Sequence, residues 1–170
     1  MKMYEFKFKG YIFRSIDELD IEVIRQWRNE DTIRSQFLYS EKISYDEQVG
    51  WYKKYSRLDN DIMFMVSDES NASKIAVGAL YNIDEISTEF GRLMVGNDKY
   101  RGRGLGKIIL EGLTWFAFNQ LKLERIYLEV FNDNLPALKS YEKVGFKRYE
   151  KDRLFNGRAL VKMEKLKSEV

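Results

Sequence analysis

The sequence predicts a single α/β domain with a mixed sheet whose first half is antiparallel. Short apolar runs of strand length alternate with segments of helical periodicity, in the order βααβββαβαββ. The 170 residues, of which 44% are hydrophobic and 15% aromatic, are enough for one domain with a substantial core. No internal repeat or low-complexity linker interrupts the chain, so residues 1–170 are assigned to one domain.

A strand and two helices are expected first. Residues 4–14 alternate between polar and apolar side chains, as in an edge strand or a half-buried strand. Ser15 and Glu18 have the spacing of a capping box, so a helix is expected to start there and run to about Asn29. The same spacing recurs from Ser44, ahead of a second helix.

The later elements complete the sheet. The best helical pattern of the chain starts at Leu105. Another helix is expected between Asn134 and Gly145, which are residue types typical of the two helix ends. The Asn-Gly pair at 156–157 is the strongest hairpin signal and joins the last two strands. The remaining strands are expected at 62–67, 74–83, 88–95, 125–130, 146–155 and 158–166.

The composition excludes several kinds of chemistry. The chain has no cysteine and no histidine, which rules out disulfides, thiolate nucleophiles, serine–histidine triads and the commonest metal ligands, so no metal is expected. Its 29 cations and 27 anions give a net charge of +2, a poor match for a nucleic-acid-binding surface. There is no signal-peptide core at the N-terminus and no apolar run as long as a membrane span, so a soluble, cytoplasmic protein is expected.

Residues 100–107, YRGRGLGK, combine three glycines with three cations between a strand and the long helix. This segment is not a Walker A loop, because only three residues separate Gly102 from the Gly-Lys pair and no serine or threonine follows. It also lacks the G-x-G-x-x-G spacing of dinucleotide-binding folds. Its backbone N–H groups and the positive end of the helix from Leu105 can still hold a phosphate. The alternative is a tight connection with solvated cations.

Two segments resemble the GNAT N-acetyltransferase superfamily. Arg101-x-x-Gly104-x-Gly106 is similar to its acyl-CoA pyrophosphate loop, and NLPALKSYEKVGF fits its N-x-x-A-x-x-x-Y-x-K-x-G-F signature. The resemblance implies the GNAT fold over nearly the whole chain. This fold is a mixed six- to seven-stranded sheet flanked by helices and splayed between the fourth and fifth strands. The signature positions are Asn134, Ala137, Tyr141, Lys143, Gly145 and Phe146.

The same resemblance implies acetyl-CoA as a co-substrate. The backbone of the glycine loop would hold its pyrophosphate, and the free edge of the strand ending at Val95 would pair with pantetheine as an added strand does. Asn134 would hydrogen-bond the pantetheine arm or cap the helix that follows it, and both roles stay open. The implied acetyl-CoA contacts are Leu93, Met94, Val95, Arg101, Gly102, Arg103, Gly104, Leu105, Gly106, Lys107 and Asn134.

Tyr141 and Glu89 are the candidate catalytic residues. A phenol with a pKa near about 10 can protonate the leaving CoA thiolate, although Tyr141 also fits as a core tyrosine. Glu89 lies in TEFG, which resembles the AEFG stretch of the RimJ/RimL-like and polyamine-acetylating branches, with Thr88 in place of Ala. It would take a proton from the amine. Glu129, a water chain or capture of free amine are the alternatives. A bulge at Gly91 would turn neighbouring side chains towards the cleft. The lack of cysteine favours direct transfer.

Residues 24–55 contain a W-R-N segment at 27–29, an I-R pair at 33–34 and an IS…E…W segment at 43–51. In these motifs they are similar to the UDP-amino-sugar N-acetyltransferases of the pseudaminic acid pathway. A nucleotide-linked amino sugar has a diphosphate and a base, which suit arginines and exposed aromatic rings. The alternative places the tryptophans in the core and the arginines on a solvated face. That family often has histidine where Gln48 stands. The implied acceptor-binding residues are Trp27, Arg28, Asn29, Arg34 and Trp51.

The leading hypothesis is an N-acetyltransferase that acts on a nucleotide-linked amino sugar. One alternative is a RimJ/RimL-like enzyme that acetylates protein N-termini or small amines such as polyamines or antibiotics. Another is a binding module that senses acyl-CoA without turnover. A polyamine site would be strongly acidic, and the net charge of +2 gives no sign of one. Nucleic-acid and membrane partners are not expected, and a homodimer stays open.

Overall fold

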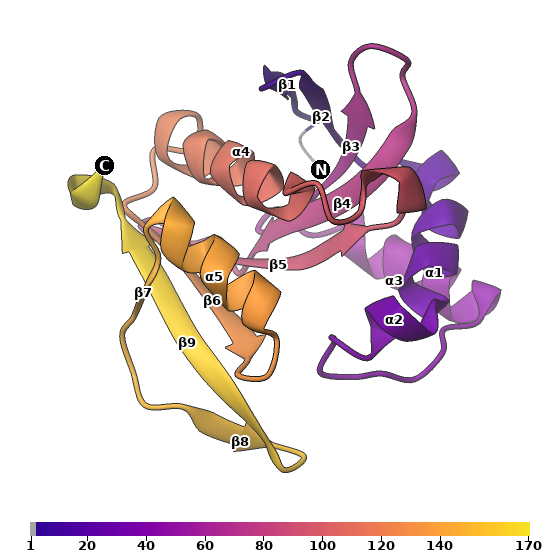
Figure 1. Ribbon diagram of the computed structural model, residues 1–170. Helices are drawn as coiled ribbons and strands as arrows, with labels where there is room; N and C mark the ends of the chain where they lie inside the picture. Colours follow the sequence, from indigo (N-terminus) through magenta and orange to yellow (C-terminus); the bar gives the residue numbers. More distant parts are fainter. Residues whose placement is uncertain (1–2) are drawn as a thin grey trace.

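The computed structural model describes residues 3–170 as a nine-stranded sheet with helices on both faces (Figure 1). The strands lie in the order β1-β2-β3-β4-β5-β6-β9-β7, β8 pairs with β9, and only β5 and β6 are parallel neighbours. None of the helices described within these residues has the length and apolar character needed to cross a bilayer.

The strands are β1 (Glu5–Phe8), β2 (Tyr11–Ser15), β3 (Ile62–Asp68), β4 (Lys74–Tyr81), β5 (Ser87–Val95), β6 (Arg125–Phe131), β7 (Lys147–Arg148), β8 (Arg153–Phe155) and β9 (Arg158–Leu166). The α-helices are α1 (Ile21–Asn29), α2 (Asp31–Arg34), α3 (Tyr45–Tyr55), α4 (Leu105–Asn119) and α5 (Leu135–Val144).

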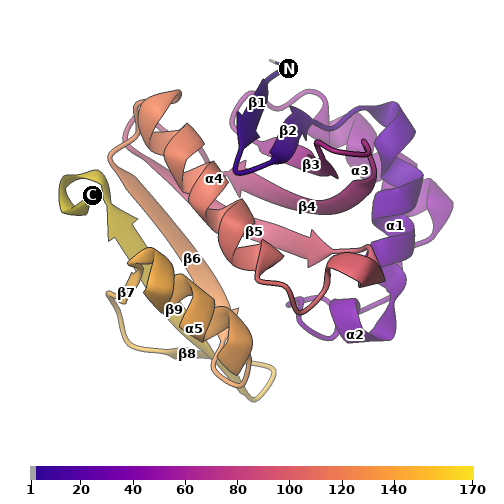
Figure 2. The ribbon, with the colours of Figure 1, turned by 45° about the horizontal axis from the view of Figure 1, so that its top comes forward.

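The sheet separates two hydrophobic clusters. Helices α4 and α5 lie over one face (Figure 2), where Leu113 and Leu138 join Phe64 in the larger cluster. Trp27 from α1 and Tyr55 from α3 belong to the smaller cluster, with residues of β3 and β4 that point to the opposite face. The predicted α/β fold with a mixed sheet is confirmed.

Strands β5 and β6 diverge in the middle of the sheet. They pair only over Ser87–Glu89 and Arg125–Tyr127, although β5 continues to Val95 and β6 to Phe131. The divergence lies between the fourth and fifth predicted strands, as expected. It leaves one edge of the second half of β5 without a strand partner among the described residues.

A bulge interrupts β5 next to this divergence. The register with β4 shifts there, and β5 has one residue more than β4 between the pairs on either side. Arg92, within the bulge, has a φ of +52°, which is uncommon for a residue other than glycine. Because of the extra residue, Phe90 packs in the larger cluster and Met94 in the smaller one. In a regular strand, both would point to the same face.

Two predictions in the N-terminal part are wrong. The predicted first strand is a hairpin, β1 and β2, because Lys9 and Gly10 take φ values of +48° and +83° and make a two-residue turn. Ser15 does not start a helix. It ends β2, and its Oγ accepts a hydrogen bond from the backbone of Tyr4 at 3.0 Å. Asp17 provides the capping box instead, before a 3₁₀ turn that leads into α1.

The other predicted helix and turn signals are confirmed. Ser44 and Glu47 form a capping box at the start of α3. Asn134 caps α5 through its side chain, and Gly145 ends that helix with a φ of +98°. The pair at 156–157 makes the turn between β8 and β9. The predicted strand before it is divided into β7 and β8. Together with the division of the first predicted strand into β1 and β2, this gives nine strands among the described residues rather than six or seven.

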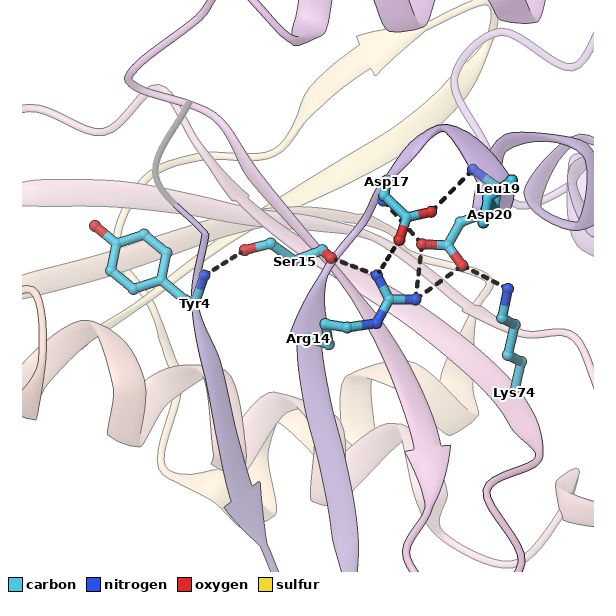
Figure 3. A network of polar contacts seen from close by, with 7 residues as sticks. All are labelled: Tyr4, Arg14, Ser15, Asp17, Leu19, Asp20 and Lys74. Atoms are coloured by element: carbon cyan, nitrogen blue, oxygen red, sulfur yellow. Dashed lines mark hydrogen bonds and ion pairs between the residues drawn. The ribbon is translucent and has the colours of Figure 1, made fainter.

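A buried carboxylate joins β2, β4 and the segment before α1 (Figure 3). Asp20 has no exposed surface, and it accepts two hydrogen bonds from Arg14 at 3.0 Å and pairs with Lys74 at 2.7 Å. Burial alone would raise the pKa of the Asp20 carboxyl. Hydrogen bonds from Lys74 and from the Asp17 backbone, with the charge of Arg14, outweigh burial and hold this pKa below its usual value.

The substitution Asp20→Asn is expected to lower the free energy of unfolding by about 3 kcal/mol, because it leaves Arg14 and Lys74 without their shared anion. Urea denaturation at neutral pH measures this change. The control is Glu69→Gln, which removes the exposed ion pair with Lys7 and should change stability much less. Equal losses in the two variants would contradict the role assigned to Asp20.

The acid dependence of stability should differ between the wild type and Asp20→Asn. The pKa of Asp20 is lower in the folded chain than its unfolded value of about 3.9. The stabilisation that the Asp20 carboxylate gives to the fold is therefore present at pH values above its pKa in the unfolded chain. It is lost as the pH falls through its pKa in the folded chain. Unfolding measured from about pH 6 to about pH 2 should show a steady difference down to about pH 4 and convergence of the two proteins in stability below it. A constant difference over this range would count against the ionised carboxylate.

Candidate active site

A cavity of about 690 Å³ opens where β5 and β6 diverge. Residues 89–95 of β5 and 129–131 of β6 form two of its walls. A third wall comes from one face of α5, and a fourth from α2 and the loop after it, up to Tyr39. The cavity thus gathers Tyr141 and Glu89, which are distant in the sequence, beside the unpaired edge of β5.

Tyr141 lies on the α5 side of this cavity and is 8% exposed. Its ring meets Phe90 edge to face, with centroids 6.2 Å apart. Among residues 3–170 the Tyr141 hydroxyl has no hydrogen-bond partner, so it is available to a group in the cavity. Burial raises the pKa of the Tyr141 phenol to about 12. The phenol is therefore protonated at neutral pH, as a proton donor must be.

The two candidate bases have different partners. Oε1 of Glu89 accepts a hydrogen bond from the Tyr81 hydroxyl at 3.1 Å, and Oε2 accepts one from the Asn82 amide at 2.9 Å. Glu129 is held by two nitrogens of Arg153, at 3.0 and 2.7 Å. Glu129 is thus committed to a cation, whereas Glu89 accepts only from neutral donors and is better placed to take a proton. No group of three acidic side chains that could hold a metal occurs among the described residues.

The glycine loop forms an anion-binding geometry at the start of α4. Gly102 and Gly104 have φ values of +70° and +74°, and no side chain caps the helix. The first N–H groups of α4 are therefore available, and the helix dipole adds positive potential there. Residues 102–107 do not line the cavity itself. Arg101, just before them, does.

Arg101 fastens this loop to its surroundings. Its Nε donates to the Val95 carbonyl at 2.7 Å, and Nη2 donates to Glu30 at 2.7 Å. Its charge is shared with a second carboxylate, that of Asp98. Arg101 therefore positions the loop, and the pyrophosphate contacts implied by the sequence would fall mainly to the backbone and to the cations after it. Since the Val95 carbonyl is occupied, the free edge of β5 ends before it.

A second cavity, of about 430 Å³, adjoins the first on the side of α1 and α3. Trp51 lines it and stacks on Tyr55, with ring centroids 5.1 Å apart. Gln48, which is 4% exposed, also lines it, and its amide has no partner among the described residues. The residues that line both cavities are Arg28, Phe37, Tyr39, Arg92 and Met94.

Arg28 is a buried cation in this shared wall. It is 9% exposed, its Nη2 donates to the carbonyl of Tyr39, and its guanidinium carbon lies 4.2 Å from the centre of the Phe37 ring. Within residues 3–170, Nη1 has no hydrogen-bond partner and no carboxylate pairs with Arg28. Burial, with the charge of Arg34, lowers the pKa of Arg28, but a guanidinium stays charged at neutral pH. Such a group suits an anionic ligand.

The other predicted acceptor residues are mostly engaged in the fold. Trp27 is packed in the smaller cluster and lines neither cavity. Asn29 exchanges two hydrogen bonds of 2.8 Å with the backbone of Ile43. Arg34 pairs with Asp31 and donates to a carbonyl of the following loop. The two predicted acceptor residues that line a cavity are Arg28 and Trp51.

Sequence reasoning missed Arg92 and Tyr81. In a regular strand Arg92 would point to the same face as Phe90, into the larger cluster. The bulge turns it to the other face, where it pairs with Asp61. The available signal was Gly91, because a Cβ there would lie 2.5 Å from the Tyr81 hydroxyl. A glycine at this place in the strand indicates a close approach by another group.

Comparison with known proteins identifies the class to which this fold and cavity belong. The acetyltransferase (GNAT) domain family matches residues 11–147, and the chain belongs to this family. Two relatives from Campylobacter jejuni, both named acetyltransferase PseH, are 32% and 29% identical over 143 residues. Those residues cover 84% of this chain and 87% of each relative. The chain is thus a GNAT acetyltransferase.

Polyamine acetyltransferases are also similar to it. Spermidine N(1)-acetyltransferase of Vibrio cholerae is 27% identical over 135 residues, which cover 78% of this chain and 76% of that relative. The crystal structure of spermidine N-acetyltransferase from Vibrio cholerae in complex with CoA and spermine has a TM-score of 0.83 at 25% identity. The match covers 94% of this chain and 96% of that one.

The residues of this chain fit acetyl-CoA. The uncapped start of α4 suits a pyrophosphate, and the unpaired edge of β5 suits an extended amide chain. Asn134 lines the cavity, and its Oδ1 caps α5 by accepting a hydrogen bond from the backbone N–H of Ala137. The thioester would then lie between β5 and Tyr141, where a proton donor is needed.

Replacing the phenol of Tyr141 (Tyr141→Phe) is expected to lower kcat by about a hundredfold or more, because the leaving thiolate loses its proton donor. The affinity for CoA should change little, since the ring and its packing remain. Steady-state kinetics and calorimetric titration with CoA measure the two quantities. Unchanged kcat would remove Tyr141 from the role of acid, and an equal loss of CoA affinity would indicate a binding role instead.

Proposed function

We propose that this chain transfers the acetyl group of acetyl-CoA to the primary amine of a nucleotide-linked amino sugar. The observation that supports this acceptor most strongly is the state of Arg28. This residue is a nine-tenths buried cation without a carboxylate partner among the described residues, and it lies in the wall shared by the two cavities. A diphosphate next to Arg28 would supply the missing negative charge and hydrogen-bond acceptors.

The second cavity supports this acceptor further. Its aromatic side chains, Trp51 and Phe37, offer apolar faces to a planar base, and the free amide of Gln48 offers a donor and an acceptor to a polar ring edge. The N-terminal half resembles the amino-sugar acetyltransferases of the pseudaminic acid pathway, and the relatives named PseH cover most of the chain. The nucleotide would occupy this cavity, and the sugar amine would reach the first one.

Direct attack is the reaction that these side chains support. Glu89 takes the proton that the ammonium group must lose, either directly or through water. The amine nitrogen then attacks the thioester carbonyl, and the carbon–sulfur bond breaks. As it breaks, Tyr141 donates its phenolic proton to the sulfur, so that CoA leaves as the thiol. The nitrogen of the new amide gives its remaining extra proton to the Tyr141 phenolate, which restores the phenol. The apolar surroundings that raise the pKa of Tyr141 also disfavour a bare thiolate, so they raise the proton affinity of the leaving sulfur as well.

A small amine is the second candidate acceptor, since spermidine acetyltransferases are similar to this chain in sequence and fold. A polyamine carries several positive charges and would need carboxylates in both cavities. Arg28 lines both of them and has no carboxylate partner among the described residues, whereas Arg92 is paired with Asp61. The carboxylates that line them are Glu89, Glu129, which is bound to Arg153, and Glu47, which caps the start of α3. This distribution of charge supports an anionic acceptor over a cationic one.

Acetyl transfer to a panel of amines tests the proposed function. The expected result is turnover with UDP-linked 4-amino sugars, followed by release of the CoA thiol, and little turnover with spermidine or with N-terminal peptides of ribosomal proteins. Turnover with spermidine or the peptides alone would assign the chain to the other acceptor class. Binding of acetyl-CoA without turnover of any amine would indicate an acyl-CoA-binding module.

Arg28→Met is expected to raise the KM for the nucleotide-linked acceptor by about tenfold to a hundredfold, because the loss of one or two charge-assisted hydrogen bonds weakens binding by about this factor. The KM for acetyl-CoA should stay close to that of the wild type. Arg28→Lys keeps the charge but not the planar fork, so its KM should lie between the two. Steady-state kinetics with each substrate varied measures these values. A loss confined to acetyl-CoA would contradict the assignment.

A further inference from the structure

Arg92 is a charged residue in the wall of both cavities for which the reaction above has no role. Its Nη1 and Nη2 donate to the two carboxylate oxygens of Asp61, at 2.6 and 2.8 Å. Asp61 lies just before β3 and is 6% exposed. This paired geometry fixes both the position and the plane of the guanidinium.

The fixed guanidinium lies over the ring of Tyr81. The distance from its central carbon to the Tyr81 ring centre is 4.5 Å, and to the ring centre of Trp51 it is 5.8 Å. Tyr81 and Glu89 are directly opposite each other on β4 and β5, and the Tyr81 hydroxyl donates to Oε1 of Glu89. A continuous set of contacts therefore runs from Asp61 through Arg92 and Tyr81 to Glu89.

The backbone around Arg92 is built for this arrangement. The bulge places Arg92 on the same face as Tyr81 and Glu89, at the cost of a φ of +52° in a residue other than glycine. Gly91, beside it, leaves the space that the Tyr81 hydroxyl occupies. The strained backbone of Arg92 and the missing side chain of Gly91 thus both help to place the Tyr81 hydroxyl.

We propose that Arg92 is a positioning residue: held by Asp61, it fixes the ring of Tyr81, whose hydroxyl holds the Glu89 carboxylate in place for the acceptor amine. The proposal rests on the proposed function for the role of Glu89. Without Arg92 the Tyr81 ring can tilt, and the carboxylate then loses one of its two fixed hydrogen bonds. The effect should fall on the chemical step and not on the binding of acetyl-CoA.

A set of variants isolates this effect. Arg92→Met should lower kcat by about tenfold or more and leave the dissociation constant for CoA unchanged. Arg92→Lys keeps a cation above Tyr81 and should recover part of the rate. The matched control is Arg125→Met, because Arg125 also pairs with a carboxylate, Glu164, and lies over tyrosine rings, but it lines neither cavity. Its kcat should equal that of the wild type.

A double-mutant cycle shows whether Arg92 acts through Tyr81. Tyr81→Phe keeps the ring and removes the hydroxyl that reaches Glu89. If Arg92 works by holding that hydroxyl, then Arg92→Met should have almost no further effect on kcat in the Tyr81→Phe background. Independent, multiplying losses in the double variant would overturn the proposal.

Two further measurements keep the test decisive. Arg92→Met leaves Asp61 buried without its cation, so the double variant Asp61→Asn with Arg92→Met is made in parallel, and circular dichroism establishes that it is folded. Its crystal structure should show the Tyr81 hydroxyl displaced from Glu89. An unchanged Tyr81–Glu89 contact would overturn the proposal even if no amine were turned over. A displaced contact, with wild-type kcat on an accepted amine, would refute the role of Glu89 instead.

Discussion

The bulge in β5 is the constraint on which the site depends. One extra residue shifts the register with β4. Beyond this residue, the positions that would point to one face of the sheet in a regular strand point to the other face. The same stretch runs beside the divergence from β6, so its outer edge is free to pair with a ligand. The orientation of Arg92 follows from this local change, and the cavity and the free edge lie where the bulged strand diverges from β6.

The charged side chains around the two cavities differ in whether they have a partner of opposite charge. Arg101, Arg92 and Glu129 are each bound to an opposite charge and so hold parts of the fold in place. Arg28 is buried without such a partner among the described residues. Since an unpaired buried charge is costly in the free protein, its place in a cavity wall supports the proposal that its partner arrives with the substrate.

Local sequence signals were reliable where a short segment controls its own conformation. The ends of α5 and the turn at 156–157 follow from residue types that favour those backbone geometries, and they form as predicted. Ser15 had the same kind of signal and was misassigned, because its hydroxyl is used between two strands instead. The hairpin of β1 and β2 was missed for a similar reason, since its turn residues, Lys9 and Gly10, are not a strong turn pair.

The sequence by itself determined most of the order of elements, the GNAT class and the segments that suit acetyl-CoA, because the glycine loop and the α5 segment depend on spacings within a few residues. The tertiary structure decided which acceptor-side residues can meet a ligand. Trp27 and Arg28 are neighbours on one helix, yet one is packed in the core and the other lines both cavities. That difference depends on how α1 packs against the sheet, and Arg92 depends on a bulge that reverses the side-chain alternation.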